Sequence, residues 1–191
     1  MPELTLASER LTLTLPQTGH AAAMLAFWQK NCDFLAPWNP PPNGDMHCLE
    51  YWQDNIDKSQ VGFLAGNQLR LLLMPRDRPG VMIGSIGYSQ IFRGPFCSCM
   101  VGYQIDQAEQ GRGLMREALQ TSLRYMFDEL RLHRVGANYM PHNVRSGRLL
   151  ASLGFRIEGY AKNYLFIGDA WRDHVLTSLV NDAFRPEWLR S

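Results

Sequence analysis

The change of hydrophobic period around Gln110-Gly-Arg-Gly113 constrains the fold of this chain more than any other feature. Residues 97 to 105 read as a strand, and after them the apolar side chains recur about every 3.6 residues, as in an amphipathic helix. The helix-forming residues are Leu114, Ala118, Leu119, Leu123 and Phe127. Two glycines permit a sharp turn, and the first amides of a helix have no internal partners, so the corner can bind a phosphate. A glycine pair alone also fits a tight turn without a ligand.

The other segments predict one α/β domain. Strands are expected at 11–15, 69–74, 81–92, 97–105, 135–139, 155–166 and 171–179, with the last two turned at Gly168-Asp169. Helices are expected at 21–29 after a cap at Thr18, from a cap at Asp45 through Ile56, at 114–127 and at 143–153. This order predicts a mixed sheet with helices on both faces, and 191 residues fit a single domain spanning 1–191.

Charge and composition exclude several classes of protein. Nineteen basic and eighteen acidic residues give a net charge of +1, so nothing global attracts nucleic acid or an anionic membrane, and any phosphate site must be local. The N-terminal residues do not resemble a secretory signal, and no apolar run approaches the ~18 residues of a membrane span. We therefore expect a cytoplasmic protein without a membrane or nucleic-acid partner.

The cysteines and histidines do not predict a metal site. Cys97 and Cys99 form the only close pair among four cysteines, and no second pair of Cys or His with ligand spacing exists. We expect buried or half-buried free thiols and no metal.

Two other phosphate-binding motifs are excluded by the residues around the turn. A Rossmann turn needs a third glycine where this chain has Arg116, and a P-loop needs a Gly-Lys-Ser/Thr that is missing.

Two motifs resemble the GCN5-related N-acetyltransferase (GNAT) superfamily. Gln110-x-x-Gly113 resembles its Gln/Arg-x-x-Gly-x-Gly/Ala signature, with Met115 as a departure at the last position, and Asn143-Val-Arg-Ser146 followed by Gly154-Phe155 resembles its second motif. Further segments resemble the RimJ and RimL group of ribosomal-protein alanine N-acetyltransferases, RimJ most of all: 34–38, 110–118, 137–143, 145–147 and 171–175. The resemblance covers about residues 8–180.

That resemblance implies an acetyl-CoA site in a splayed gap between two parallel strands. The backbone of Tyr103, Gln104 and Ile105 would pair with the pantetheine arm, and an amide there would stabilise the thioester oxygen by ~3 kcal/mol. The pyrophosphate would lie on Gln110, Gly111, Arg112, Gly113, Leu114 and Met115, and Arg112 and Arg116 would add positive charge. Asn143 would bond the pantetheine, with Ser146 near the sulfur. Beside the resemblance, we expect Trp38, Tyr164, Trp171 and Asp173 to form the acceptor slot, the alternative being that the aromatic residues among them belong to the core.

The catalytic roles also follow from the resemblance. The RimL branch uses a glutamate where this chain has Glu158, so Glu158 is the expected base. The alternatives are a solvated strand carboxylate, or one paired with Arg156 or Lys162. As the general acid, many superfamily members use a tyrosine seven residues after the asparagine, and this chain has Leu150 at that position. Protonation of the leaving thiolate then falls to Ser146, to Tyr139 or to solvent, and Ser146 is the expected acid.

The expected reaction is acetyl transfer from acetyl-CoA to the N-terminal α-amine of a protein, the resemblance indicating the alanine of ribosomal protein S5. A small-molecule amine acetyltransferase and a non-catalytic coenzyme A-binding or ribosome-assembly module are the alternatives, because one fold supports many functions. A ribosomal-protein N-terminus, with or without the small ribosomal subunit, is the expected partner. Monomer and homodimer both remain open.

Overall fold

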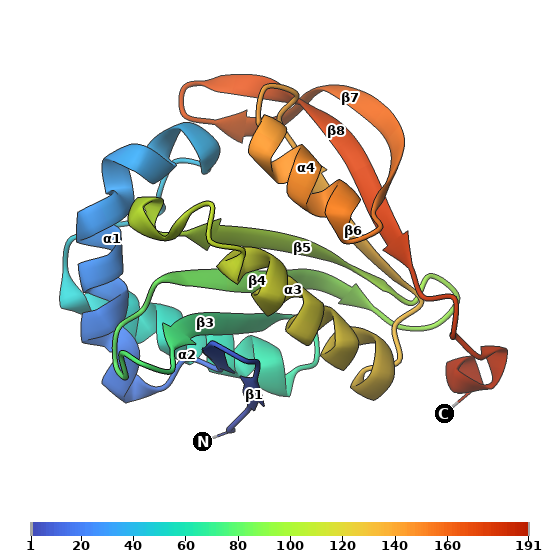
Figure 1. The fold of residues 1–191 in the computed structure, drawn as a ribbon, viewed down its shortest axis with the longest axis horizontal. Coiled ribbons are helices and arrows are strands. Elements are labelled where there is room, and N and C mark those ends of the chain that lie inside the picture. Colours follow the sequence, from blue (N-terminus) through green and yellow to red (C-terminus); the bar gives the residue numbers. More distant parts are fainter. Residues whose placement is uncertain (1, 191) are drawn as a thin grey trace.

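One mixed sheet of eight strands organises residues 2–190, the part of the chain that the computed structural model describes. Its strand order is β1-β2-β3-β4-β5-β6-β8-β7 (Figure 1). The strands are β1 (Thr5–Ala7), β2 (Leu11–Thr14), β3 (Leu69–Pro75), β4 (Gly84–Phe92), β5 (Ser98–Ile105), β6 (Arg134–Tyr139), β7 (Arg156–Ile167) and β8 (Ala170–Val180). The helices are α1 (Ala21–Leu35), α2 (Leu49–Leu64), α3 (Leu114–Arg124) and α4 (Val144–Ser152). The predicted α/β fold with a mixed sheet is confirmed.

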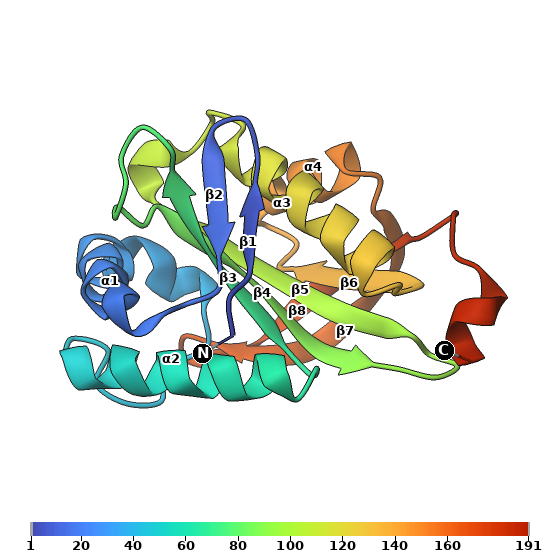
Figure 2. The same ribbon diagram turned by 90° about the horizontal axis from the view of Figure 1, so that it is seen from below.

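The helices cover both faces of the sheet. Figure 2 shows α1 and α2 on one face and α3 and α4 on the other. Strand β3 is buried on both sides: Leu71 and Leu73 pack in the core beneath α3, whereas Leu72 and Met74 pack with α1 and α2. This double burial explains why β3 reads as a continuous apolar run and not as an alternation.

The one parallel pair of the sheet is short. Strands β5 and β6 pair only from Ser98 to Met100 against Arg134 to Gly136, although β5 runs on to Ile105 and β6 to Tyr139. Beyond this point β5 remains paired with β4, and β6 remains paired with β8. The two strands therefore separate, and the sheet opens between them.

Several predicted boundaries differ from the structure. The predicted cap at Asp45 is wrong: α2 begins after Cys48, and Asp45 instead closes a turn by accepting hydrogen bonds from the backbone of His47 and Cys48. The predicted cap at Thr18 is also wrong, because Thr18 opens a 3₁₀ turn (Thr18–His20) that precedes α1.

Other differences lie at the ends of elements. The α-helical bonding of α3 ends at Arg124 and continues as a π turn over Tyr125–Glu129. Strand β1 was not predicted, because three exposed or half-exposed residues carry too little periodicity. Within residues 2–190, none of the helices is both long and apolar enough to cross a membrane.

Candidate active site

A cavity of about 890 Å³ lies where β5 and β6 separate, and we call it the main cavity. Its walls come from both sides of the sheet. Phe34 lies in the last turn of α1 and Trp38 follows that helix, whereas Leu114 belongs to α3 and Ser146 to α4. Figure 2 shows α1 and α3 on opposite faces of the sheet. Because residues from both faces line the main cavity, it passes through the sheet. A ligand bound on the α3 side can therefore meet a second ligand arriving from the α1 side.

Strand β5 presents an unpaired edge to the main cavity. Tyr103, Gln104 and Ile105 line it, and their other edge is paired with β4. The side-chain amide of Gln104 is fixed by two hydrogen bonds: its Nε2 donates to Ser85 Oγ at 3.2 Å, and its Oε1 accepts from Asn39 Nδ2 at 3.3 Å. Because none of the strands within residues 2–190 pairs with the inner edge past Met100, its backbone groups are open to an extended ligand, which can add as a strand would.

The glycine turn forms the next wall of the main cavity. Gly111 has φ +75° and Gly113 has φ +76°, and Gly113 is the N-cap of α3. A left-handed backbone is unfavourable for residues with a Cβ, so both positions require glycine or pay in strain. Gln110, Gly111, Gly113, Leu114 and Met115 all line the cavity, so the positive end of α3 faces it.

Ion pairs hold the turn in place, and Glu109, which accepts two of them, also lines the main cavity. The buried carboxylate of Glu109 accepts a hydrogen bond from Arg78 at 2.8 Å and one from Arg112. Arg10 donates to the carbonyl of Arg112 at 3.0 Å and also pairs with Glu117 at 2.7 Å. The guanidinium of Arg112 thus faces Glu109, and Arg112 does not line the main cavity.

A second carboxylate ties the turn to α1. Asp106 accepts hydrogen bonds from Lys30 Nζ at 2.6 Å and from the amide of Ala108 at 2.9 Å. Burial alone would raise the pKa of Asp106, but the hydrogen bond from Lys30 and the bond from the Ala108 amide together hold that pKa below its usual value. The carboxylate therefore stays ionised and fixes the strand-to-turn corner.

Three arginines line the main cavity near the turn: Arg116, Arg145 and Arg148. Arg145 also donates to the side chain of Gln110, linking α4 to the turn. Sequence reasoning singled out Arg116 but missed Arg145 and Arg148, although they flank Ser146 one helical turn apart. Positive charge at this site is thus local, in a chain whose net charge is only +1.

The hydroxyl of Tyr103 meets Ser146 inside the main cavity. The two oxygens are 2.6 Å apart, and both residues line the cavity. Burial raises the pKa of Tyr103 to about 12, so the phenol stays neutral at physiological pH. Asn143 caps α4 by accepting the amide of Ser146 at 3.1 Å, which leaves its Nδ2 group as a donor beside the cavity. Leu150 is buried in the core and presents no functional group.

Tyr139 forms the adjacent wall of the main cavity. A Cβ placed on Gly147 of α4 would lie 2.9 Å from its ring, so α4 approaches β6 closely because residue 147 has no side chain. This contact sets the distance between Ser146 and the gap of the sheet.

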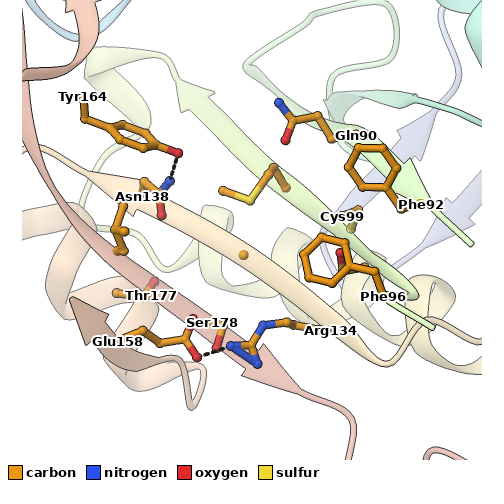
Figure 3. A pocket seen from close by; sticks show the side chains of 14 residues that line it. Gln90, Phe92, Phe96, Cys99, Arg134, Asn138, Glu158, Tyr164, Thr177 and Ser178 are labelled. Carbon is orange, nitrogen blue, oxygen red and sulfur yellow. Dashed lines mark hydrogen bonds and ion pairs between the residues drawn. The ribbon is translucent and has the colours of Figure 1, made fainter. Parts of the chain in front are cut away.

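A second, smaller hollow of about 220 Å³ lies against the sheet at the β4–β5 hairpin, and we call it the hairpin pocket (Figure 3). It shares Gln90, Met100, Asn138 and Tyr164 with the main cavity, so the two are contiguous. Glu158 lines the hairpin pocket and not the main cavity. Its carboxylate pairs with Arg134, and not with the Arg156 or Lys162 considered from the sequence.

The four residues predicted for the acceptor slot separate into two groups. Trp38 lines the main cavity, 5.5 Å from the ring of His142, and Tyr164 lines both cavities while accepting a hydrogen bond from Asn138 at 2.9 Å. Trp171 and Asp173 line neither cavity. Trp171 packs on Phe166, and the Asp173 carboxylate accepts from the Tyr160 hydroxyl at 2.6 Å and from a backbone amide at 2.8 Å.

The four cysteines are free thiols, with Cys97 and Cys99 buried and Cys32 and Cys48 half-buried, as predicted. In the described part of the chain, no three His, Cys, Asp or Glu side chains come together as a metal site would require.

Comparison with known proteins agrees with this geometry. A family model described as acetyltransferase (GNAT) domain matches residues 10–156. The [ribosomal protein uS5]-alanine N-acetyltransferase of Escherichia coli (strain K12) is 41% identical over 189 residues, which cover 98% of this chain and 94% of that protein.

Two solved structures share the fold over nearly the whole chain. The ribosomal-protein-S5-alanine acetyltransferase from Vibrio fischeri superposes with a TM-score of 0.90 at 33% identity, covering 96% of this chain and 100% of that one. Mycobacterium smegmatis RimJ in complex with CoA-disulfide superposes with a TM-score of 0.87 at 26% identity, covering 95% and 91%. The matched segment contains the glycine turn and both separating strands, and the chain belongs to the GNAT acetyltransferase family as an acetyl-CoA-dependent N-acetyltransferase.

Proposed function

We propose that this enzyme acetylates the N-terminal α-amine of a protein, and that its acceptor is the alanine terminus of ribosomal protein S5. The observation that carries the proposal is 41% identity over 189 residues to a protein named for that reaction. The main cavity supports it, because a passage through the sheet lets an acceptor reach the thioester from the face opposite the cofactor. The alternatives of a small amine or a non-catalytic module have no comparable support.

We infer the placement of acetyl-CoA from the cavity walls. The pyrophosphate lies on the amides of Gln110 to Met115, and Arg116, Arg145 and Arg148 supply the positive charge that phosphates require. The pantetheine arm runs along the open edge of β5 at Tyr103 to Ile105, and Asn143 Nδ2 donates to it.

The proposed reaction forms one C–N bond and breaks one C–S bond. The neutral α-amine attacks the thioester carbon, the nitrogen loses one proton, and the departing thiolate gains one. Placement of the two reactants supplies much of the rate. An α-amine has a pKa of about 7.7 to 8.0, so a weak base suffices, whereas a lysine side chain at about 10.4 is far less often neutral.

Glu158 is the proposed base, acting on the nitrogen through a water. Its support is position: Glu158 lines the hairpin pocket, which meets the main cavity at Asn138 and Tyr164. Arg134 holds the carboxylate in place.

Ser146 is the proposed acid, and Tyr103 is a positioning residue for it. When the phenol donates to Ser146 Oγ, the serine hydrogen turns away from Tyr103 and toward the rest of the cavity. The serine then gives its proton to the sulfur and regains one from water. The Tyr103–Ser146 pair thus supplies a proton-donating hydroxyl on the α4 side, where Leu150 replaces the tyrosine of other superfamily members and supplies none.

The test is mass spectrometry of peptides incubated with acetyl-CoA. A peptide beginning with alanine and containing an internal lysine should gain one acetyl group at its α-amine. The same peptide with a blocked terminus is the control and should gain none. Acetylation of lysine alone, or of a free polyamine with no product on the alanine peptide, would overturn the proposed acceptor but not the acetyltransferase activity.

A further inference from the structure

The hairpin pocket is walled by an exposed aromatic pair. Phe92 and Phe96 are 50% and 62% exposed, and their ring centroids are 6.0 Å apart. Large apolar side chains that group at an exposed site are typical of surfaces that bind a protein or another ligand. At about 220 Å³ the pocket is smaller than the roughly 300–1,000 Å³ of small-molecule sites, so a single side chain suits it better than a whole ligand.

Strained backbone builds this wall. Gln90 has φ +53° and Cys97 has φ +37°, both in the left-handed region that residues other than glycine rarely adopt. The β4–β5 pairing also shifts register between Ser89 and Phe92, which places an extra residue in β4. Such strain persists where the surrounding structure imposes it, often at functional sites. Here it accompanies the presentation of Gln90 and Phe92 to the pocket.

The hairpin pocket continues the route that an acceptor would follow. Figure 3 shows Tyr164 and Asn138 at one end of the pocket and the two phenylalanines at the other. Tyr164 and Asn138 also line the main cavity. A chain whose first residue lies where β5 and β6 separate can therefore continue over the sheet to Phe92 and Phe96, gaining at most ~3.6 Å per residue.

We propose that the hairpin pocket binds an apolar side chain of the acceptor polypeptide, a few residues after its N-terminus. The inference rests on the proposed function and extends it, since it makes the enzyme recognise a length of chain and not only the terminal residue. Phe92 and Phe96 contact that side chain, and Gln90 and Asn138 border the backbone that leads to it.

The experiment compares acceptors of two lengths. One is an alanine dipeptide amide, and the other is a peptide of about 12 residues that begins with alanine, has a glycine and serine background, and carries one leucine moved through successive positions. For the parent enzyme, one leucine position should raise kcat/KM over the leucine-free peptide. Phe92→Ala and Phe96→Ala should remove that gain, lowering kcat/KM about tenfold for the best peptide, as for a central interface contact. Both variants should leave the dipeptide rate and acetyl-CoA affinity unchanged.

The control is Leu64→Ala, which removes an exposed apolar side chain of α2 that lines neither cavity and should change neither rate. Equal losses on both acceptors, or no loss on either, would overturn the inference while the parent activity still supports the proposed function. Calorimetry of the long peptide with CoA-loaded enzyme measures binding to the hairpin pocket without turnover. It therefore tests the inference even if no α-amine is acetylated. Undiminished binding by the phenylalanine variants, or no binding by the parent, refutes the pocket. If instead these variants change only sedimentation, the pocket is a contact between two copies of the chain and the inference is wrong.

Discussion

The Tyr103–Ser146 hydrogen bond gives the sharpest test of the proposed chemistry. Tyr103→Phe keeps the ring and deletes only the hydroxyl that lies 2.6 Å from Ser146 Oγ. The serine hydroxyl then turns among three staggered positions, and it loses a hydrogen bond worth about 0.5–1.5 kcal/mol. If the whole of that energy is expressed at the transition state, kcat should fall about 2- to 13-fold.

A double-mutant cycle distinguishes positioning from packing. Single-turnover rates with the alanine peptide are measured at saturating acetyl-CoA for Tyr103→Phe, Ser146→Ala and the double variant. If Tyr103 acts through Ser146, the double variant should be no slower than Ser146→Ala alone. Losses that multiply across the two substitutions would refute the positioning role, as would an unchanged rate in Tyr103→Phe.

The core of the protein offers a matched control. Tyr88 and Ser122 form the same kind of pair at 2.9 Å, but both are buried in the core and line neither cavity. Tyr88→Phe should lower the free energy of unfolding by about 1 kcal/mol without changing kcat.

The pH dependence adds a second check on Tyr103. Burial raises the pKa of Tyr103 to about 12, above its ordinary value of 10.0, so the stability that its neutral form provides is complete below pH 10 and is lost as pH rises toward 12. Tyr103→Phe should therefore not shift the pH–rate profile between about pH 6 and 9.

Three further predictions concern the turn, the base and the acid range. Gly113→Val should weaken acetyl-CoA binding in calorimetry and lower the free energy of unfolding by about 1–2 kcal/mol, because φ is +76° there, and Gly113→Asn should cost less; a folded Val variant of unchanged affinity would contradict this. Glu158→Gln should slow turnover at neutral pH and spare acetyl-CoA affinity, and matching rates from about pH 6 to 9 would make Glu158 a bystander. The pKa of Asp106 is depressed below 3.8, so its stabilisation is present above that pH and disappears as pH falls through the lower folded value. Thermal melts of Asp106→Asn should show a shallower acid loss than those of the parent, and parallel curves would rule the effect out.

The local pattern of the sequence predicted the elements that carry the fold. The alternation in Leu11–Thr14 and the 3.6-residue period after Gly113 each depend on neighbours in the chain, and both elements formed where expected. Dependence on chain neighbours alone also explains the errors at Thr18 and Asp45. The start of a helix depends on which backbone amides already donate hydrogen bonds within turns, and the local pattern does not show this. Arg145 and Arg148 were overlooked because a charged residue on a helix is usually interpreted as solvent-exposed, and the sequence does not show that a cavity lies beside it.

By itself, the sequence determined the order of the strands from β2 onward and of the helices, the glycine turn at Gln110 to Gly113, and the family resemblance, since each rests on residues close together in the chain. Only the tertiary structure decided which side chains share a site. Tyr103 and Ser146 are 43 positions apart, and Arg134 and Glu158 are 24 apart. Tyr103 and Ser146 meet because β5 and β6 stop pairing after Met100 and Gly136, which opens the sheet and brings α4 beside β5. Arg134 and Glu158 meet because β6 and β7 both pair with β8. Trp171 and Asp173 line neither cavity. The β7–β8 hairpin that carries them shifts register between Ile157 and Gly159 and between Ala161 and Leu165, and the sequence pattern alone did not show on which side of the hairpin their side chains would lie.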